Sequence, residues 1–159
     1  MRWFLLNLEC PQLMIRVYGT LPLVFLHASQ CLIPSASVAN TVVTAIKHLP
    51  SEPTIIATSS TGILSTADKL PLLLKPLYKL LLAKAHVDKI NMENAITDNT
   101  QKWMLVRGAL YTDGKRRGRY RTGEGEVGYT ISRRDVADFI VREGLNGETW
   151  IGKRPVVVY

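Results

Sequence analysis

The sequence predicts an α/β fold built on a parallel β-sheet. Short apolar runs rich in β-branched residues alternate with segments of helical spacing, and such runs suit strands that are buried on both faces. Strands that alternate with helices form one parallel sheet through right-handed crossovers. We expect about four strands, at residues 21–26, 54–58, 103–107 and 155–159.

Two helices should lie between the first three strands. Residues 35–49 carry apolar side chains at helical spacing and are followed by Pro50. Pro71 and Pro76 forbid an unbroken helix after the second strand, so the main helix there should begin near Leu77. Two i,i+4 ion pairs are expected on it, Lys84 with Asp88 and Lys89 with Glu93.

A third helix should begin at Ser132. Ser132 and Asp135 resemble a capping box in which Asp takes the place of Glu. The helix should end near residues 144–147, where two glycines occur. Its inward-facing apolar side chains should be Val136, Phe139 and Ile140.

Composition excludes several classes of protein. The 159 residues, 47% of them hydrophobic, suffice for one domain with a real core. No apolar run approaches the roughly 20 residues of a membrane span. Cys10 and Cys31 form no disulfide framework, and the three histidines show no metal-ligand spacing with them. We therefore expect a cytoplasmic protein without a metal site.

The net charge of +7 is not spread evenly, because five basic residues lie within seven positions. Such a basic segment can hold phosphate or nucleic acid. No aromatic stacking pattern or known binding module accompanies it, so a solvated loop is the favoured interpretation and nucleic acid is not the expected partner. The basic residues concerned are Lys115, Arg116, Arg117, Arg119 and Arg121.

The segment Gly123-Glu-Gly-Glu-Val-Gly128 matches the G-x-G-x-x-G dinucleotide fingerprint. That fingerprint needs a strand before it and a helix directly after it, whose free N–H groups receive the pyrophosphate. Here residues 129–131 are expected to be extended rather than helical, and Glu124 and Glu126 would repel phosphate. A surface turn or hairpin is the expected structure.

In parallel sheets, ligands bind beyond the carboxyl ends of the strands. That rule selects three short segments of this chain, at the ends of the first three expected strands. They are residues 27–29, Ser59 with Ser60, and Arg107 with Gly108 and Ala109.

Several motifs follow one another along the chain. They are Ser59-Ser60, His86-x-Asp-Lys-x-x-x-Glu93, Trp103-x-x-Val-Arg107, Asp113-Gly114, Tyr129-Thr-Ile-Ser-Arg-x-Asp-Val-Ala137 and Trp150-x-Gly-Lys153. With these motifs the chain resembles the atypical short-chain dehydrogenase/reductases, the NAD(P)H-binding group that includes biliverdin reductase B/flavin reductase and NmrA-like proteins, and especially its fungal members. The resemblance covers roughly residues 21–159.

The resemblance implies a partial Rossmann-like sheet of about four strands with helices on both faces, and with the first βαβ unit missing. Residues 1–20 then form an atypical segment, because a βαβ unit needs about 30 residues. We therefore expect NAD(P)H binding to be weak or absent. An exposed edge at strand 21–26 should be covered by residues 3–18 or by a second copy in a homodimer.

The resemblance also implies roles for individual residues. Ser59, Lys89 and His86 are the candidate catalytic residues, and the candidate cofactor-binding residues are Ser60, Arg107, Gly108 and Ala109. The alternatives are a serine pair that satisfies a turn, a Lys89–Glu93 salt bridge, a surface histidine, and an arginine that pairs with a carboxylate. Lys89 stands where the Tyr-x-x-x-Lys dyad of the typical enzymes has its lysine, but Ala85 replaces the tyrosine.

Two functions follow from these expectations. The first is an NAD(P)-dependent reductase of a small molecule, in a short or truncated form. The second is a non-catalytic, NmrA-like binding or regulatory protein, which the missing glycine loop and the missing tyrosine favour. The sequence does not identify the substrate.

Overall fold

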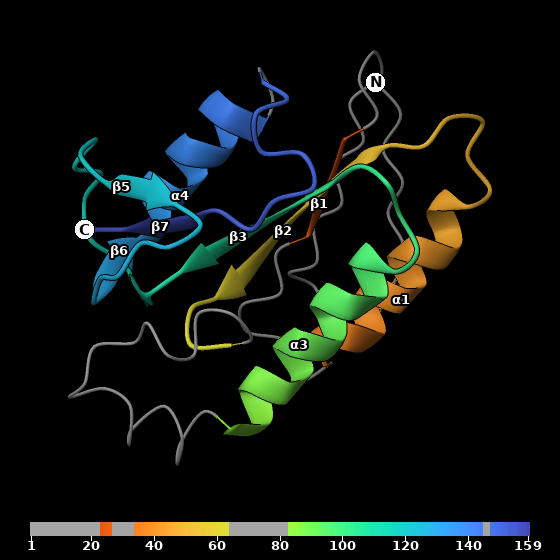
Figure 1. The fold of residues 1–159 in the computed structure, drawn as a ribbon, viewed down its shortest axis with the longest axis horizontal. Coiled ribbons are helices and arrows are strands. Elements are labelled where there is room, and N and C mark those ends of the chain that lie inside the picture. Colours follow the sequence, from red (N-terminus) through yellow and green to blue (C-terminus); the bar gives the residue numbers. More distant parts are fainter. Residues whose placement is uncertain (1–22, 27–33, 64–82, 145–146) are drawn as a thin grey trace.

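A five-stranded sheet forms the centre of the molecule (Figure 1). The computed structural model describes residues 23–26, 34–63, 83–144 and 147–159. The strand order is β1-β2-β3-β7-β5. Four of these strands are parallel: β1 (Leu23–Leu26), β2 (Thr54–Ser60), β3 (Trp103–Gly108) and β7 (Val156–Val158). They overlap the four strands expected from the sequence, and the expected parallel sheet is confirmed, with β2 and β3 as direct neighbours.

Helices cover both faces of this sheet, as expected. Helices α1 (Ser35–Ile46) and α3 (Ala83–Thr97) pack side by side on one face. Helix α4 (Arg133–Phe139), extended by the π-helical turn η3 (Ile140–Gly144), covers the other. A partial Rossmann-like α/β fold results.

Successive side chains of each strand point to opposite faces of the sheet, so the hydrophobic core has two parts. Ile55, Ala57 and Leu105 pack with α1 and α3, whereas their neighbours Ile56 and Met104 pack with α4. Successive side chains of a strand point to opposite faces, so a strand covered on both sides must be apolar throughout. This explains why the strands read as continuous apolar runs.

The helix boundaries differ from the expectation in one described place. Helix α1 ends at Ile46 rather than Leu49, and Leu49 is 37% exposed. His48 N–H and Leu49 N–H donate to carbonyls three residues back, so the last turn tightens before the proline that follows. The start expected near Leu77 lies outside the described residues. Helix α3 is described from Ala83 onward.

Three short strands were not among the four expected, although an extended conformation was expected at residues 129–131. Strand β5 (Arg121–Gly123) runs antiparallel to β7, and β4 (Leu110–Thr112) pairs with β6 (Thr130–Ser132) in a separate two-stranded sheet. Each has three residues, too few to show a period-two pattern.

The glycine fingerprint of residues 123–128 begins at the last residue of β5, includes a turn and ends before β6. No helix follows it directly, so the expectation of a surface turn is confirmed. A Cβ atom on Gly128 would lie 2.5 Å from Val158 Cβ, so close packing requires this glycine.

Strand β1 is the edge strand of the described sheet, as the sequence analysis expected for strand 21–26. The segment expected to cover it lies outside the described residues. Cover by that segment or by a second copy therefore stays a prediction. Among the described residues, no helix combines the length and the apolarity needed to cross a membrane.

Candidate functional site

The carboxyl ends of β2 and β3 lie together. Ser59 is opposite Arg107 and Ser60 is opposite Gly108 in the parallel register. The ladder continues one residue further, because Thr61 N–H donates to Gly108 O at 2.9 Å. Gly62 then adopts a φ of 84°, which ends the extended run. Ser59, Ser60, Arg107 and Gly108, which the sequence selected, are therefore neighbours.

Alternation along β2 and β3 predicts which face their ends present. Ala57 and Leu105 pack against α1 and α3, so Ser59 and Arg107, two residues further on, face the same side. The contact between Arg107 and Glu93 of α3 agrees with this placement.

Arg107 and Glu93 form a buried, bidentate ion pair. Arg107 Nε donates to Glu93 Oε1 at 3.0 Å and Nη2 donates to Oε2 at 2.7 Å, with side-chain exposures of 1% and 0%. Arg154 Nε adds a 3.3 Å contact to Glu93 Oε2 and lies over the Trp103 ring. Arg107 thus pairs with a carboxylate, one of the two alternatives left open by the sequence. Its cofactor contact stays a prediction.

The two expected ion pairs on α3 are wrong for the described structure. Glu93 contacts the two arginines instead of Lys89. Asp88 accepts hydrogen bonds from Ser35 N–H at 2.8 Å and Ala36 N–H at 3.1 Å. Helix α1 begins after Pro34, which has no side-chain cap, so Asp88 caps it from the neighbouring helix. Helical spacing alone could not reveal these partners, because they lie on other elements.

Lys89 is half-buried next to this ion-pair network. Its ammonium lies 4.0 Å from Met92 Sδ. Burial lowers the pKa of Lys89 below its usual value, and the charges of Asp88 and Glu93 only partly oppose this effect.

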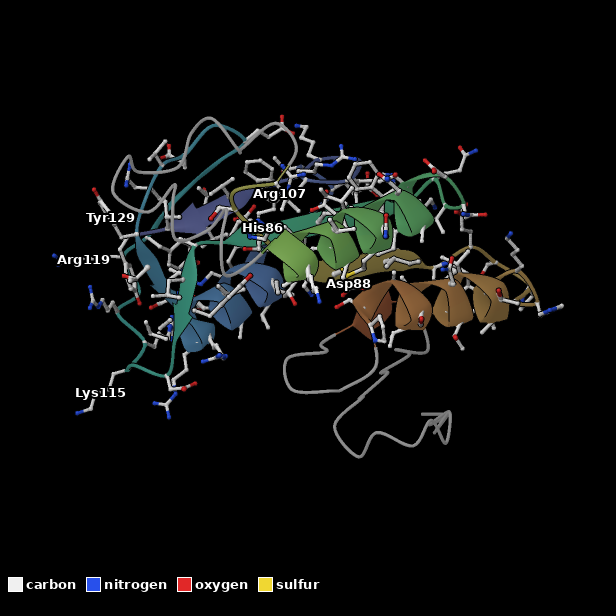
Figure 2. All side chains as sticks on the ribbon, turned by 90° about the horizontal axis from the view of Figure 1, so that it is seen from below. His86, Asp88, Arg107, Lys115, Arg119 and Tyr129 are labelled. Carbon is white, nitrogen blue, oxygen red and sulfur yellow. The ribbon has the colours of Figure 1, made fainter. Side chains whose placement is uncertain are left out.

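His86 lies one turn before Lys89 on α3. Burial lowers the pKa of His86, which favours the neutral imidazole. Figure 2 shows His86 and Asp88 on different sides of the helix, with Asp88 toward α1. His86 is half-buried, so it does not fit the alternative of a surface histidine.

Two buried hydroxyl groups stand at the carboxyl end of β2. Ser59 is 2% exposed and Thr61 is 6% exposed, and neither Ser59 Oγ nor Thr61 Oγ1 has a hydrogen-bond partner within the described chain. Ser60 Oγ, in contrast, donates to Thr61 O at 3.1 Å. Buried polar atoms in proteins are nearly always paired, so each exception calls for an explanation such as a bound water, an ion or a functional role. Sequence reasoning selected Ser59 and missed Thr61.

Tyr111 fixes the ends of β2 and β3. Its hydroxyl donates to Ser59 O at 2.6 Å and accepts from Gly108 N–H at 3.0 Å. A Cβ atom on Gly108 would lie 2.4 Å from the Tyr111 ring, so this approach requires glycine. Ala109 is buried with Val156 and Val158. These contacts give Gly108 and Ala109 packing roles, and their cofactor contacts stay predictions.

Asp135 anchors the basic segment. Its carboxylate accepts from Arg117 N–H and Gly118 N–H, and also from the hydroxyls of Ser132 and Tyr159. Ser132 Oγ accepts from Asp135 N–H, which is half of the expected capping box. The other half is not formed, because Ser132 N–H donates to the Tyr159 hydroxyl.

Burial alone would raise the pKa of Asp135, but its hydrogen bonds outweigh burial. The donors are Arg117 N–H, the Tyr159 and Ser132 hydroxyls, and Gly118 N–H, and they hold the pKa of this carboxyl well below its usual range. Asp135 is therefore a fixed anion within the fold.

The basic side chains of this segment are largely neutralised or exposed. Arg116 pairs with Asp138 and Arg121 with Glu126, while Arg117 stacks over the Tyr159 ring. Lys115 and Arg119 are exposed and extend outward in Figure 2. This arrangement agrees with a solvated loop.

The partial Rossmann-like fold is of the type found in NAD(P)-binding α/β proteins. A family model described as NAD(P)H-binding matches residues 35–143. The chain belongs to this NAD(P)H-binding, reductase-like family, and the resemblance to atypical short-chain dehydrogenase/reductases is confirmed.

Comparisons with individual proteins agree with this family assignment. The chain is 33% identical over 148 residues to reductase pytE of Aspergillus terreus, covering 77% of this chain and 56% of that protein. A short-chain dehydrogenase/reductase from Veillonella parvula, solved in complex with NADP, matches with a TM-score of 0.68 at 16% identity over 86% of this chain and 62% of that one. The anaerobilin reductase ChuY of Escherichia coli matches with a TM-score of 0.68 at 15% identity, covering 86% and 63% of the respective chains. The chain thus spans less than two thirds of each of these proteins.

Proposed function

We propose that this chain serves in the NAD(P)H-dependent reduction of a small molecule, with its site at the carboxyl ends of β2 and β3. The observation that carries the proposal is the pair of unpartnered, buried hydroxyls of Ser59 and Thr61. An unsatisfied buried hydroxyl costs about 1–3 kcal/mol, which a bound polar ligand would remove. The position also obeys the rule that ligands of parallel sheets bind beyond the carboxyl ends of their strands.

The donor set at this edge fits the nicotinamide end of the cofactor. A hydroxyl can donate and accept, so Ser59 and Thr61 suit a carboxamide or a substrate carbonyl. Bound NAD(P)H would supply the hydride. The chain would orient the reactants against Ser59 and Lys89, with Ser60, Gly108 and Ala109 at the border of the site. His86 is the candidate proton donor, because Ala85 offers no phenol. Burial favours its neutral imidazole, so proton donation from the charged form should become more effective as the pH falls.

The pyrophosphate end has less support among the described helices, so we keep the expectation of weak binding. A pyrophosphate prefers the free N–H groups of a helix N-terminus. At α1, Ser35 N–H and Ala36 N–H already donate to Asp88. At α4, Asp135 N–H donates to Ser132 Oγ.

A non-catalytic, NmrA-like binding protein is the second candidate. Ala85, which takes the place of the dyad tyrosine, is exposed on α3 and carries no proton donor. The same site would then bind NAD(P)H without turnover. NADPH binding without any NADPH oxidation across a panel of small carbonyl compounds and quinones would favour this candidate.

A fluorescence titration with NADPH tests the proposal. We expect weak, saturable binding by the whole chain and a roughly 2- to 10-fold loss of affinity in Ser59→Ala, the effect of one neutral hydrogen bond. Ser37→Ala is the matched control, because Ser37 is exposed on α1, and it should bind like the parent chain. Equal affinity in all three chains would contradict the proposed site, and submicromolar binding would contradict the expected weakness.

A further inference from the structure

Lys89 is a half-buried cation without a carboxylate partner among the described residues. Its ammonium lies 4.0 Å from Met92 Sδ, which is not an anion. Partial burial already makes an unpaired charge costly. A ligand of opposite charge would remove this cost.

The acidic side chains closest to Lys89 on α3 are already engaged. The Asp88 carboxylate accepts from the first two N–H groups of α1. The Glu93 carboxylate is held by Arg107 and Arg154. Neither can turn to Lys89 without leaving buried donors unsatisfied.

The topology places Lys89 near the two unpartnered hydroxyls. Glu93 contacts Arg107, and Arg107 is opposite Ser59 in the β2–β3 register. Helix α3 connects two parallel strands, so it runs back across the sheet and its N-terminal half lies toward their carboxyl ends (Figure 1). Lys89 is therefore one turn further toward this edge than Glu93, and Thr61 is two residues further than Ser59.

We propose that Lys89, Ser59 and Thr61 form a binding pocket for a carboxylate group. A carboxylate accepts hydrogen bonds only, and this trio offers an ammonium and two hydroxyl donors. A single cation matches a singly charged group. A phosphate dianion would call for a second cation, and the neighbouring Arg107 and Arg154 are both engaged by Glu93.

This pocket deepens the proposed function, on which the assignment of a substrate class rests. In the proposed reductase, the carboxylate belongs to the substrate, which is then a small carbonyl compound whose acid group, rather than its carbonyl, contacts the two hydroxyls. Binding of a carboxylate does not itself require the cofactor.

Benzoate is a suitable probe, and the Nζ signal of Lys89 in a chain labelled with 15N-lysine is the readout. Without NADPH, saturating benzoate should raise the pKa of Lys89 by about 1, as a nearby opposite charge does. Affinity should fall as the pH rises through the pKa of Lys89, because the ammonium is then lost. Lys84, exposed on the same helix, serves as the internal control and should not respond.

Two substitutions at Thr61 distinguish the pocket from general charge effects. Thr61→Val keeps the shape and removes the hydroxyl, so it should weaken benzoate binding roughly 5- to 10-fold. Thr61→Ser keeps the hydroxyl and should bind nearly as the parent does. An unchanged Lys89 signal, or equal responses of Lys84 and Lys89, would overturn the pocket even if NADPH binds. A benzoate response in a chain that fails to bind NADPH would retain the pocket and remove the proposed function.

Discussion

Replacing Glu93 by leucine is expected to lower the free energy of unfolding by about 3–5 kcal/mol, the effect of leaving one member of a buried ion pair uncompensated. Arg107 would lose both hydrogen bonds of its bidentate contact while remaining 1% exposed. Arg154 would suffer less, because its side chain is 32% exposed and can be hydrated. Urea unfolding followed by circular dichroism measures the change.

The double variant Glu93→Leu/Arg107→Met separates the pair from its surroundings. Removing both charges should be far less destabilising than Glu93→Leu alone, because no buried charge is left unpaired. Glu148→Leu, at an exposed position without an ion pair among the described residues, should unfold like the parent chain. A Glu93→Leu variant as stable as the parent would show that Arg107 finds another anion.

Asp135→Ala is expected to destabilise the chain by about 3 kcal/mol, because several buried donors lose one shared acceptor. Arg117 N–H, Gly118 N–H and the Ser132 and Tyr159 hydroxyls all donate to this carboxylate. Hydrogen exchange should report faster opening of residues 113–120 than of β2 and β3. Asp98→Ala, at an exposed position, is the matched control.

The sign of the pH dependence follows from the lowered pKa of Asp135. The unfolded chain binds this proton more readily than the folded chain, so the stabilisation is complete above the ordinary aspartate pKa of about 3.9. It decreases as the pH falls from that value through the lower pKa of the folded state. The difference between parent and Asp135→Ala should therefore stay constant near neutral pH and shrink only in acid. A difference that is largest in acid would contradict this assignment.

The parallel strands could be predicted because burial on both faces leaves a continuous apolar signal. Residues 54–58 and 103–107 have that signal, and both became central strands. Strand β5 could not be predicted in the same way, since Arg121, Thr122 and Gly123 carry no apolar pattern and gain their place by pairing with β7. An apolar pattern in the sequence reports burial. A short strand that forms only because it pairs with a neighbouring strand shows no such pattern.

The site was partly predictable from the positions at which the strands end. The rule for carboxyl ends of strands selected Ser59 and Arg107 without knowledge of their neighbours. The partners of Glu93 and Asp88 come from other elements, so i,i+4 spacing pointed to the wrong pairs. Thr61 was missed because a threonine after a strand carries no motif; only its burial without a partner distinguishes it.

The most direct test of the proposed site is to map NADPH on the 15N-labelled chain by amide chemical shifts, up to millimolar cofactor so that weak binding is visible. We expect saturable shifts at residues 59–62, 86–89 and 107–109, at the carboxyl ends of β2 and β3 and the start of α3. Residues 113–121 should shift little, because ion pairs and the Asp135 carboxylate already engage this loop within the fold. Shifts confined to that basic loop, or no saturable shifts anywhere, would contradict the assignment of the cofactor site.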